Sequence, residues 1–147
     1  MNIAINGFGR IGRVVLKIAL EKKLKVVAIN DVHGAEYAAY LFKYDSIYGK
    51  YEGKVGFDKD YLIINGTKIK VISEREISNI SWKKLGADIV VESTGVFTDR
   101  ENASKHLTSG ARFVVITSPA KQPDITIVPG VNHKLLKKEH KIISVAS

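Results

Sequence analysis

Short apolar runs alternate with segments of helical periodicity along the chain. The runs predict β-strands, because they are rich in Val and Ile and are bounded by turn residues. The expected strands span residues 2–6, 24–30, 55–57, 61–65, 68–72, 88–92, 112–117, 125–128 and 142–145. The expected helices span residues 10–23, 36–43, 100–107 and 132–138.

The helical segments carry apolar positions and capping residues that predict how each helix packs. The first helix is expected to turn Ile11, Val14, Val15, Ile18 and Ala19 inward, and the second to turn Tyr37, Tyr40 and Leu41 inward. Either Thr98 or Asp99 is expected to cap the third helix, and Asn132 the fourth, because their side-chain oxygens accept backbone N–H groups.

The order of these elements predicts an α/β fold of the Rossmann type. Strands that alternate with crossover helices form a doubly wound, mostly parallel sheet. Around residues 54–72 the pattern changes, because Asp58-Lys59-Asp60 and Asn65-Gly66 are turn signals between short strands. We expect a small antiparallel excursion there. No linker or internal repeat divides the sequence, so one domain is expected over residues 1–147.

Composition narrows the kind of protein and the kind of site. The 147 residues are 45% hydrophobic and 26% charged, as in globular proteins. The sequence contains no cysteine, which excludes disulfides, thiolate metal sites and a cysteine nucleophile among these residues. No apolar stretch has the length of a membrane span and no signal-peptide layout opens the sequence. We expect no membrane partner and a cytoplasmic location.

The formal net charge of +8 raises the question of an anionic partner. The lysines cluster in two places, at Lys17, Lys22, Lys23 and Lys25 and at Lys134, Lys137, Lys138 and Lys141. They alternate with apolar positions as on a solvated face, and no aromatic signature for base stacking accompanies them. Nucleic acid is therefore not expected as a main partner.

The segment Ile5-Asn6-Gly7-Phe8-Gly9-Arg10-Ile11-Gly12-Arg13 carries the pattern G-x-G-x-x-G between a predicted strand and a predicted helix. In dinucleotide-binding folds the first glycine allows the tight turn, the second the close approach of pyrophosphate, and the third close helix packing. The N–H groups of Arg10 and Ile11 would face the phosphates. A glycine-rich turn explains the motif alone, but its place between strand and helix favours a dinucleotide site.

Asp31 stands at the end of the second predicted strand, about 20 residues after the glycine motif. A carboxylate at this place accepts hydrogen bonds from both hydroxyls of the adenosine ribose. It also repels a 2′-phosphate, so the expected cofactor is NAD and not NADP.

Two later strand ends carry small and hydroxyl residues, Ser93-Thr94-Gly95 and Thr117-Ser118-Pro119. Ligands of open parallel sheets bind at the carboxyl ends of the strands, so these residues are candidates to line a cofactor groove. Ordinary turn chemistry explains the same residues equally well.

Together these segments resemble the NAD-binding half of glyceraldehyde-3-phosphate dehydrogenase. The resemblance runs through the whole chain, in INGFGRIGR at 5–13, VVAIND at 26–31, LFKYDS at 41–46, SERE at 73–76, ADIVVESTGVFT at 87–98, TSPAKQPDITIVPGVNH at 117–133 and HKIISVAS at 140–147. NGFGRIGR and ESTGVFT are the most distinctive of these.

The resemblance implies a role for each candidate residue of the site. Arg10 and Ile11, in the cofactor-binding loop with Gly7, Gly9 and Gly12, would place their backbone N–H groups on the pyrophosphate, and Asp31 would hold the adenosine ribose. Arg75 would lie beside the adenine and present mainly its backbone. Thr94, Gly95 and Phe97 would line the groove, with Phe97 toward the adenine, and Thr117 would lie near the nicotinamide ribose.

This sequence departs from the family pattern at three places. Tyr48 stands where the family usually has a histidine, and Val145 where it usually has an asparagine before its nucleophile. The third is at Ser147, the last residue, which the catalytic cysteine of the family would follow. We therefore expect an NAD-binding domain without its catalytic domain, able to bind NAD and unable to turn over.

The expected parent activity is the NAD-dependent phosphorylating oxidation of glyceraldehyde 3-phosphate in glycolysis by a homotetramer. Two alternatives stay open: the corresponding domain of erythrose-4-phosphate dehydrogenase, and a stand-alone NAD-sensing or RNA-binding module. No catalytic or metal-binding residue is assigned. The four histidines, His33, His106, His133 and His140, are expected in loops or on helix surfaces.

Overall fold

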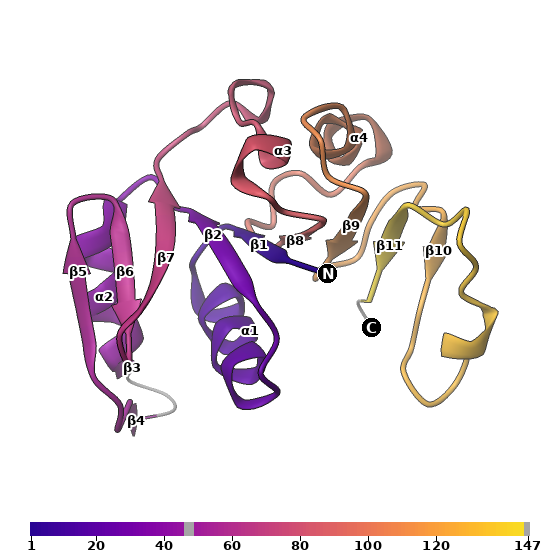
Figure 1. Ribbon diagram of the computed structural model, residues 1–147. Helices are drawn as coiled ribbons and strands as arrows, with labels where there is room; N and C mark the ends of the chain where they lie inside the picture. Colours follow the sequence, from indigo (N-terminus) through magenta and orange to yellow (C-terminus); the bar gives the residue numbers. More distant parts are fainter. Residues whose placement is uncertain (46–48, 146–147) are drawn as a thin grey trace.

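The computed structural model describes residues 1–45 and 49–145, in which strands and helices alternate as the sequence pattern predicts (Figure 1). The strands are β1 (Ile3–Asn6), β2 (Val26–Asn30), β3 (Tyr44–Asp45), β4 (Gly49–Lys50), β5 (Val55–Asp58), β6 (Tyr61–Ile64), β7 (Thr67–Ile72), β8 (Ile89–Glu92), β9 (Phe113–Ile116), β10 (Ile125–Thr126) and β11 (Ile142–Ser144). The helices are α1 (Arg10–Glu21), α2 (Gly34–Lys43), α3 (Trp82–Leu85) and α4 (Arg100–Thr108), with 3₁₀ turns η1 (Ile77–Asn79) and η2 (His133–Leu135).

The main sheet has the order β10-β11-β9-β8-β1-β2-β7-β6-β5. From β1 the chain builds toward one edge through β2 and β7, and later returns to pair β8 with the other side of β1. All these pairs are parallel, whereas β5, β6 and β7 pair antiparallel. The doubly wound Rossmann fold and the antiparallel excursion are therefore confirmed. The reversal beside β1 creates a crevice at the carboxyl ends of β1 and β8.

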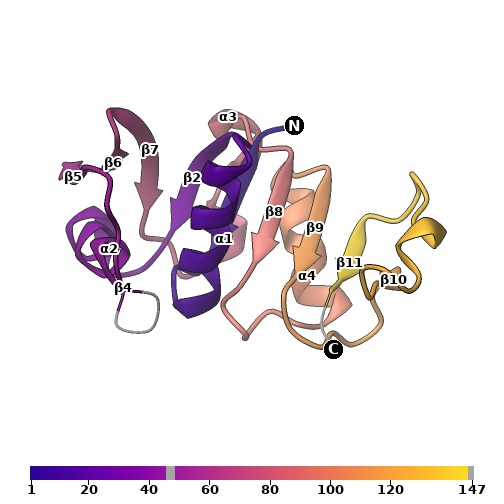
Figure 2. The ribbon, with the colours of Figure 1, turned by 90° about the horizontal axis from the view of Figure 1, so that it is seen from below.

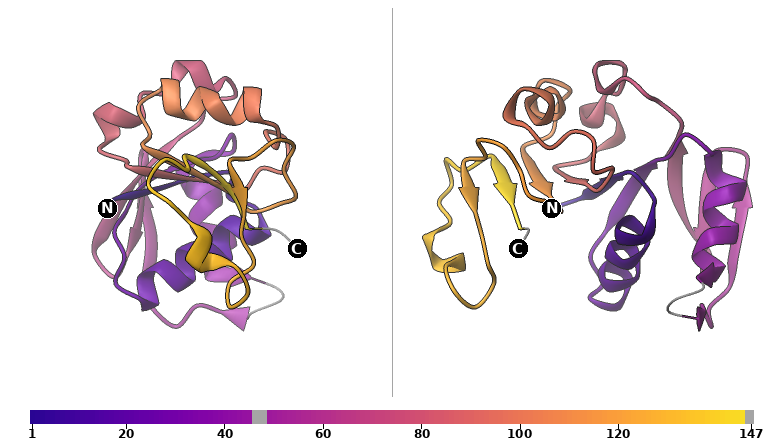
Figure 3. Two further views of the ribbon diagram at one scale, coloured as in Figure 1. Left: turned by 90° about the vertical axis from the view of Figure 1, so that its right-hand side faces the viewer. Right: turned by 180° about the vertical axis from the view of Figure 1, so that it is seen from behind.

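Helices cover both faces of the sheet, α1 and α2 one face and α3 and α4 the other (Figures 1 and 3). Seen from below, α1 lies in front of the central strands and α2 lies beside it (Figure 2). The core under α1 and α2 contains Leu16, Phe42 and Leu62, and the core on the opposite face is built around Trp82 and Val90. None of the helices in the described residues is both long and apolar enough to cross a membrane.

The inner faces of α1 and α2 differ from those expected. Tyr37 and Tyr40 are exposed, and α2 buries Ala35, Ala38, Ala39 and Phe42 instead. These positions form one stripe at helical spacing, and the small alanines let the helix lie close to the sheet. In α1 the buried stripe is Gly12, Leu16 and Ala19, whereas Ile11 and Ile18 are exposed.

The helix expected at 132–138 with its Asn132 cap is wrong, one segment had no predicted element, and the predicted cap of α4 is confirmed. The helix expected at 132–138 is only η2, because the Asn132 side chain accepts from Val128 N and folds the loop back instead of capping a helix. No element was expected between β7 and β8, where η1 and α3 lie and Trp82 is fully buried. Of the two candidate caps of α4, the residue that caps it is Asp99, which accepts from Asn102 N.

Asp124 ties the outer strands β10 and β11 together. Its Oδ2 accepts from the backbone N–H groups of Lys141 at 2.6 Å and Ile142 at 3.0 Å, and its Oδ1 accepts from the Arg100 guanidinium. Burial acts to raise the pKa of Asp124, but these hydrogen bonds and the Arg100 charge outweigh it and hold the pKa below its ordinary value.

Replacing this carboxylate should cost stability in a pH-dependent way. Asp124→Asn should lower the free energy of unfolding near pH 7 by about 1 kcal/mol, because the amide is a poorer acceptor for three donors. Since the folded-state pKa is lowered, this stabilisation is present above the unfolded-state pKa and is lost as the pH falls through the folded-state pKa. Urea denaturation should therefore show the gap between wild type and variant narrowing from about pH 7 to about pH 2.

The control is Asp58→Asn, whose carboxylate is 60% exposed and lies 3.7 Å from Lys68 Nζ. It should change the free energy of unfolding by less than about 0.5 kcal/mol. A gap between wild type and Asp124→Asn that stays constant with pH would contradict the role of Asp124.

Candidate dinucleotide-binding site

A cleft of about 360 Å³ lies at the carboxyl ends of β1, β2 and β8. Three aligned polar residues end these strands, since Asn6 pairs in register with Asn30 on one side and Glu92 on the other. The residues that line the cleft come from the last positions of β1 and β2 and from the loops after β1, β2, β7 and β8: Asn6, Gly7, Phe8, Gly9, Asn30, Asp31, Val32, His33, Glu74, Arg75, Ser93, Thr94, Val96 and Phe97.

Gly7 and Gly12 allow the glycine loop to pack tightly on its surroundings. Gly7 has a φ of +95°, and a Cβ there would lie 2.8 Å from the backbone nitrogen of Thr94. A Cβ on Gly12 would overlap the carbonyl oxygen of Gly7. Ser93 Oγ donates to that same oxygen at 2.7 Å. Any larger side chain at Gly7 or Gly12 would push the start of α1 and the segment after β8 apart.

Gly9 has a different environment, because a Cβ on this residue would meet no atom within 4 Å. Its φ of −78° is accessible to any residue. Gly9 is the N-cap of α1 and offers no side-chain cap, and the first turn contains no acidic residue. Within the described residues no side chain caps the first N–H groups of α1, and uncapped N–H groups at the start of a helix are an arrangement that binds anions.

Asp31 lines the same cleft as the glycine loop, with a side chain only 13% exposed. Its Oδ1 accepts from the backbone N–H of His33 at 2.8 Å and lies 3.1 Å from His33 Nδ1. Its Oδ2 has no hydrogen-bond partner among residues 1–45 and 49–145. The carboxylate is thus held by one oxygen and keeps an acceptor for a ligand.

The cleft brings together six of the residues that the sequence singles out: Gly7, Gly9, Asp31, Arg75, Thr94 and Phe97. Arg10, Ile11 and Gly12 begin α1 beside it, and Gly95 follows Thr94 with a φ of +75°. Thr117 is not among the lining residues, and its Oγ1 donates to the carbonyl oxygen of Glu92 at 3.2 Å. Tyr48, Ala146 and Ser147 lie outside the described residues.

Sequence reasoning missed the asparagines of the site. Asn30 Nδ2 donates to Asn6 Oδ1 at 2.7 Å and to the carbonyl oxygen of Glu74 at 2.8 Å, while Asn30 Oδ1 accepts from Glu74 N at 2.8 Å. These bonds join the ends of β1 and β2 to the segment after β7. A signal was present, because each asparagine is the last residue of an apolar strand.

The expectation that all four histidines lie in loops or on helix surfaces is wrong for His106. This residue of α4 is fully buried, with Nε2 3.0 Å from Glu92 Oε1 and Nδ1 3.0 Å from Trp82 Nε1. Helical periodicity had not separated it from the polar positions of α4. The other three, His33, His133 and His140, lie in loops or turns as expected.

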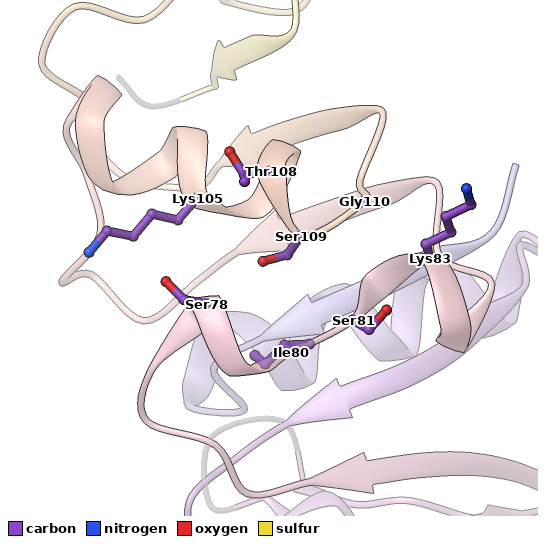
Figure 4. Close-up of a pocket in the computed structure, with 8 residues that line it drawn as sticks. All are labelled: Ser78, Ile80, Ser81, Lys83, Lys105, Thr108, Ser109 and Gly110. Carbon is purple, nitrogen blue, oxygen red and sulfur yellow. The ribbon is translucent and has the colours of Figure 1, made fainter.

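A second hollow of about 420 Å³ lies between η1, α3 and α4 (Figure 4). Its hydroxyl groups are engaged, since Ser109 Oγ donates to Ile77 O at 3.2 Å and Thr108 Oγ1 to Ser104 O at 3.3 Å. Lys83 and Lys105 extend away from each other (Figure 4), and Lys105 Nζ lies 3.9 Å from Glu76. None of the residues predicted for the site lies here, so the cleft with the glycine loop is the better candidate despite its smaller volume.

Comparison with known proteins agrees with this geometry. A family described as "Glyceraldehyde 3-phosphate dehydrogenase, NAD binding domain" matches residues 1–100. Glyceraldehyde-3-phosphate dehydrogenase of Thermotoga maritima is 53% identical over 148 residues, which is 99% of this chain and 44% of the relative. The Geobacillus stearothermophilus enzyme is 50% identical over 149 residues, which is 100% of this chain and 44% of the relative.

A third relative, glyceraldehyde-3-phosphate dehydrogenase 1 of Kluyveromyces marxianus, is 54% identical over the full chain and is covered to 45% of its length. The chain thus spans less than half the length of these curated relatives. The family match covers most of the chain and includes the glycine loop, Asp31, Thr94 and Phe97. This chain belongs to the family of NAD-binding domains of glyceraldehyde 3-phosphate dehydrogenase.

Proposed function

We propose that residues 1–147 form one NAD-binding domain and that the cleft at the ends of β1, β2 and β8 holds NAD. The observation that carries this proposal is that the glycine loop and Asp31 line the same cleft. The open space at Gly9 fits a pyrophosphate, and the unpartnered Oδ2 of Asp31 fits the hydroxyls of a ribose.

The proposal assigns the two ends of the cofactor to different residues. The N–H groups of Arg10 and Ile11 bind the pyrophosphate beside Gly9, Gly7 and Gly12 allow the loop to pack closely, and Asp31 binds the adenosine ribose. The adenine lies between Arg75 and Phe97. Thr94 and Gly95 line the groove, and Thr117 reaches the nicotinamide ribose.

We further propose that the parent enzyme oxidises and phosphorylates glyceraldehyde 3-phosphate with NAD. When bound, NAD supplies the hydride acceptor, and the residues of this chain orient it. These 147 residues contain no cysteine, so they hold no thiolate to attack an aldehyde. We therefore expect no dehydrogenase activity from this chain by itself.

Partners of the same proposal are a catalytic domain and further subunits of a homotetramer. An apolar hollow of about 430 Å³ supports a docking role, because Ile89, Phe113, Val115 and Ile143 of β8, β9 and β11 line it together with Leu136. A contiguous apolar hollow of this kind is typical of interaction sites.

Loss of the Asp31 carboxylate should weaken NAD binding. Asp31→Ala removes the acceptor for the ribose hydroxyls and should cost about 1–3 kcal/mol of binding free energy. Isothermal titration calorimetry with NAD measures this directly, and Asp60→Ala, with a carboxylate 68% exposed in the β5–β6 turn, is the control. Equal affinity of wild type and Asp31→Ala would contradict the ribose assignment.

Alanine at Gly9 and at Gly12 should separate ligand binding from folding. Gly9→Ala places a methyl group in open space at an ordinary φ, so stability should change by less than about 0.5 kcal/mol, while NAD affinity should fall at least about tenfold. Gly12→Ala meets the Gly7 carbonyl and should lower the free energy of unfolding by about 1–3 kcal/mol. Full NAD affinity in Gly9→Ala would rule out a pyrophosphate at this position.

The purified chain should not turn over glyceraldehyde 3-phosphate. An assay with NAD and phosphate that follows NADH absorbance should give the rate of the blank, because the chain has no thiol nucleophile. A purified full-length relative serves as the positive control. Turnover by a preparation with the chain's mass of 16.2 kDa would refute this expectation.

A further inference from the structure

A continuous path of hydrogen bonds runs from the core between α3 and α4 to the walls of the cleft. It begins at Trp82 Nε1, passes through His106 and reaches Glu92 at the end of β8. His106 and Trp82 are fully buried and Glu92 is 1% exposed. Neither His106 nor Glu92 is among the residues that line the cleft.

The partners of His106 assign its tautomer. The indole N–H of Trp82 can only donate, so Nδ1 of His106 must accept. The ring proton therefore sits on Nε2, from which it is donated to Glu92 Oε1 at 3.0 Å. The His106–Glu92 contact is thus a hydrogen bond with a defined direction and not an ion pair between two charged side chains.

The carboxylate of Glu92 accepts hydrogen bonds from two residues that line the cleft, in addition to the one from His106. Oε1 also accepts from Asn6 Nδ2 at 2.8 Å, and Oε2 accepts from Thr94 Oγ1 at 2.9 Å and Thr94 N at 3.1 Å. All four contacts deliver a hydrogen to Glu92, which an ionised carboxylate can accept without supplying one. Asn6 and Thr94 are both lining residues.

Thr94 in turn limits where the glycine loop can lie. The missing Cβ of Gly7 would lie 2.8 Å from Thr94 N, so any shift of the Thr94 backbone changes the space for the turn before α1. The second arm runs from Asn6 through Asn30 to the backbone of Glu74, next to Arg75. Through Asn6 and Thr94, Glu92 is therefore connected to three segments of the cleft wall.

Packing alone does not need such a path. Apolar side chains of similar volume would fill the same space. A buried polar network in which every group has its hydrogen-bond partner specifies one geometry, which apolar packing does not. Here the hydrogen bonds of Glu92 reach Asn6 and Thr94, which line the cleft. The geometry that the network specifies is therefore that of the cleft wall.

We propose that Glu92 and His106 are positioning residues of the NAD site, which hold Thr94 and Asn6 in place through directed hydrogen bonds without contacting the cofactor. This rests on the proposed binding of NAD in the cleft. The consequence is that a change in α4, which covers one face of the sheet, alters NAD affinity through Thr94.

Two substitutions at His106 separate positioning from packing. His106→Gln keeps an N–H donor near the place of Nε2 and so keeps the bond to Glu92, but it leaves the Trp82 indole without its acceptor. His106→Asn keeps a side-chain oxygen near the place of Nδ1 for Trp82 but is too short to reach Glu92. Both variants leave one of the two bonds broken, so a purely structural role predicts similar effects on NAD binding.

Three readouts are measured on wild type and both variants. NAD affinity comes from calorimetry, at a temperature at which circular dichroism shows every variant folded. Amide exchange by NMR reports the protection of Thr94 N–H, and the indole N–H resonance reports on Trp82, the single tryptophan of the chain. Glu21→Gln, at the far end of α1 from the cleft, is the control for the effect of a substitution outside the hydrogen-bond path.

The proposal expects His106→Asn to raise the dissociation constant for NAD at least about fivefold and to speed exchange of the Thr94 amide at least about tenfold. His106→Gln should stay within about twofold of wild type in both, while its indole resonance moves upfield. Glu21→Gln should match wild type in all readouts.

Three results would overturn the proposal. The first is an equal NAD affinity of the two His106 variants, and the second is an exchange rate of the Thr94 amide that His106→Asn leaves unchanged. The third is fast exchange of the Thr94 amide in the wild-type chain, a measurement that does not depend on whether a variant folds. If wild type does not bind NAD, the proposed function fails, and Thr94 exchange still decides whether His106 and Glu92 hold this segment.

Discussion

The close approach of Gly7 to Thr94 fixes how the turn after β1 packs against the segment after β8. Because the turn after β1 and the segment after β8 touch through their backbones, neither can move without the other. Gly12 brings the first turn of α1 even closer to the Gly7 carbonyl. These two contacts hold the glycine loop against the sheet, and a Cβ on Gly9, which lies between Gly7 and Gly12 in the sequence, would meet no atom within 4 Å.

The same edge is polar in its interior, which is unusual for the centre of a parallel sheet. Asn6, Asn30 and Glu92 end three neighbouring strands at the same level, and their side chains satisfy one another. Backbone groups of the loops after these strands complete the set. The strand ends thus form the base of the cleft. Its shape depends on hydrogen bonds with defined directions as well as on packing.

Much of this architecture can be predicted from the sequence, and the exceptions have physical reasons. The glycine spacing and Asp31 predicted residues at one cleft, because Gly7 has a positive φ, a Cβ on Gly12 would overlap the Gly7 carbonyl, and a strand end places Asp31. Periodicity failed for Tyr37 and Tyr40, since alanines sit closer to the sheet than tyrosines can. It also failed for His106, because no local pattern reveals that Glu92 and Trp82 meet it from other elements.

Chemical-shift mapping by NMR as NAD is added would test where the cofactor binds. The cleft described above predicts that the largest shifts fall on the amides of residues 9–12, 31–33 and 94–97, with none at the hollow around Ser78 and Ser109. Shifts confined to that hollow, or no shifts at millimolar NAD, would contradict the account.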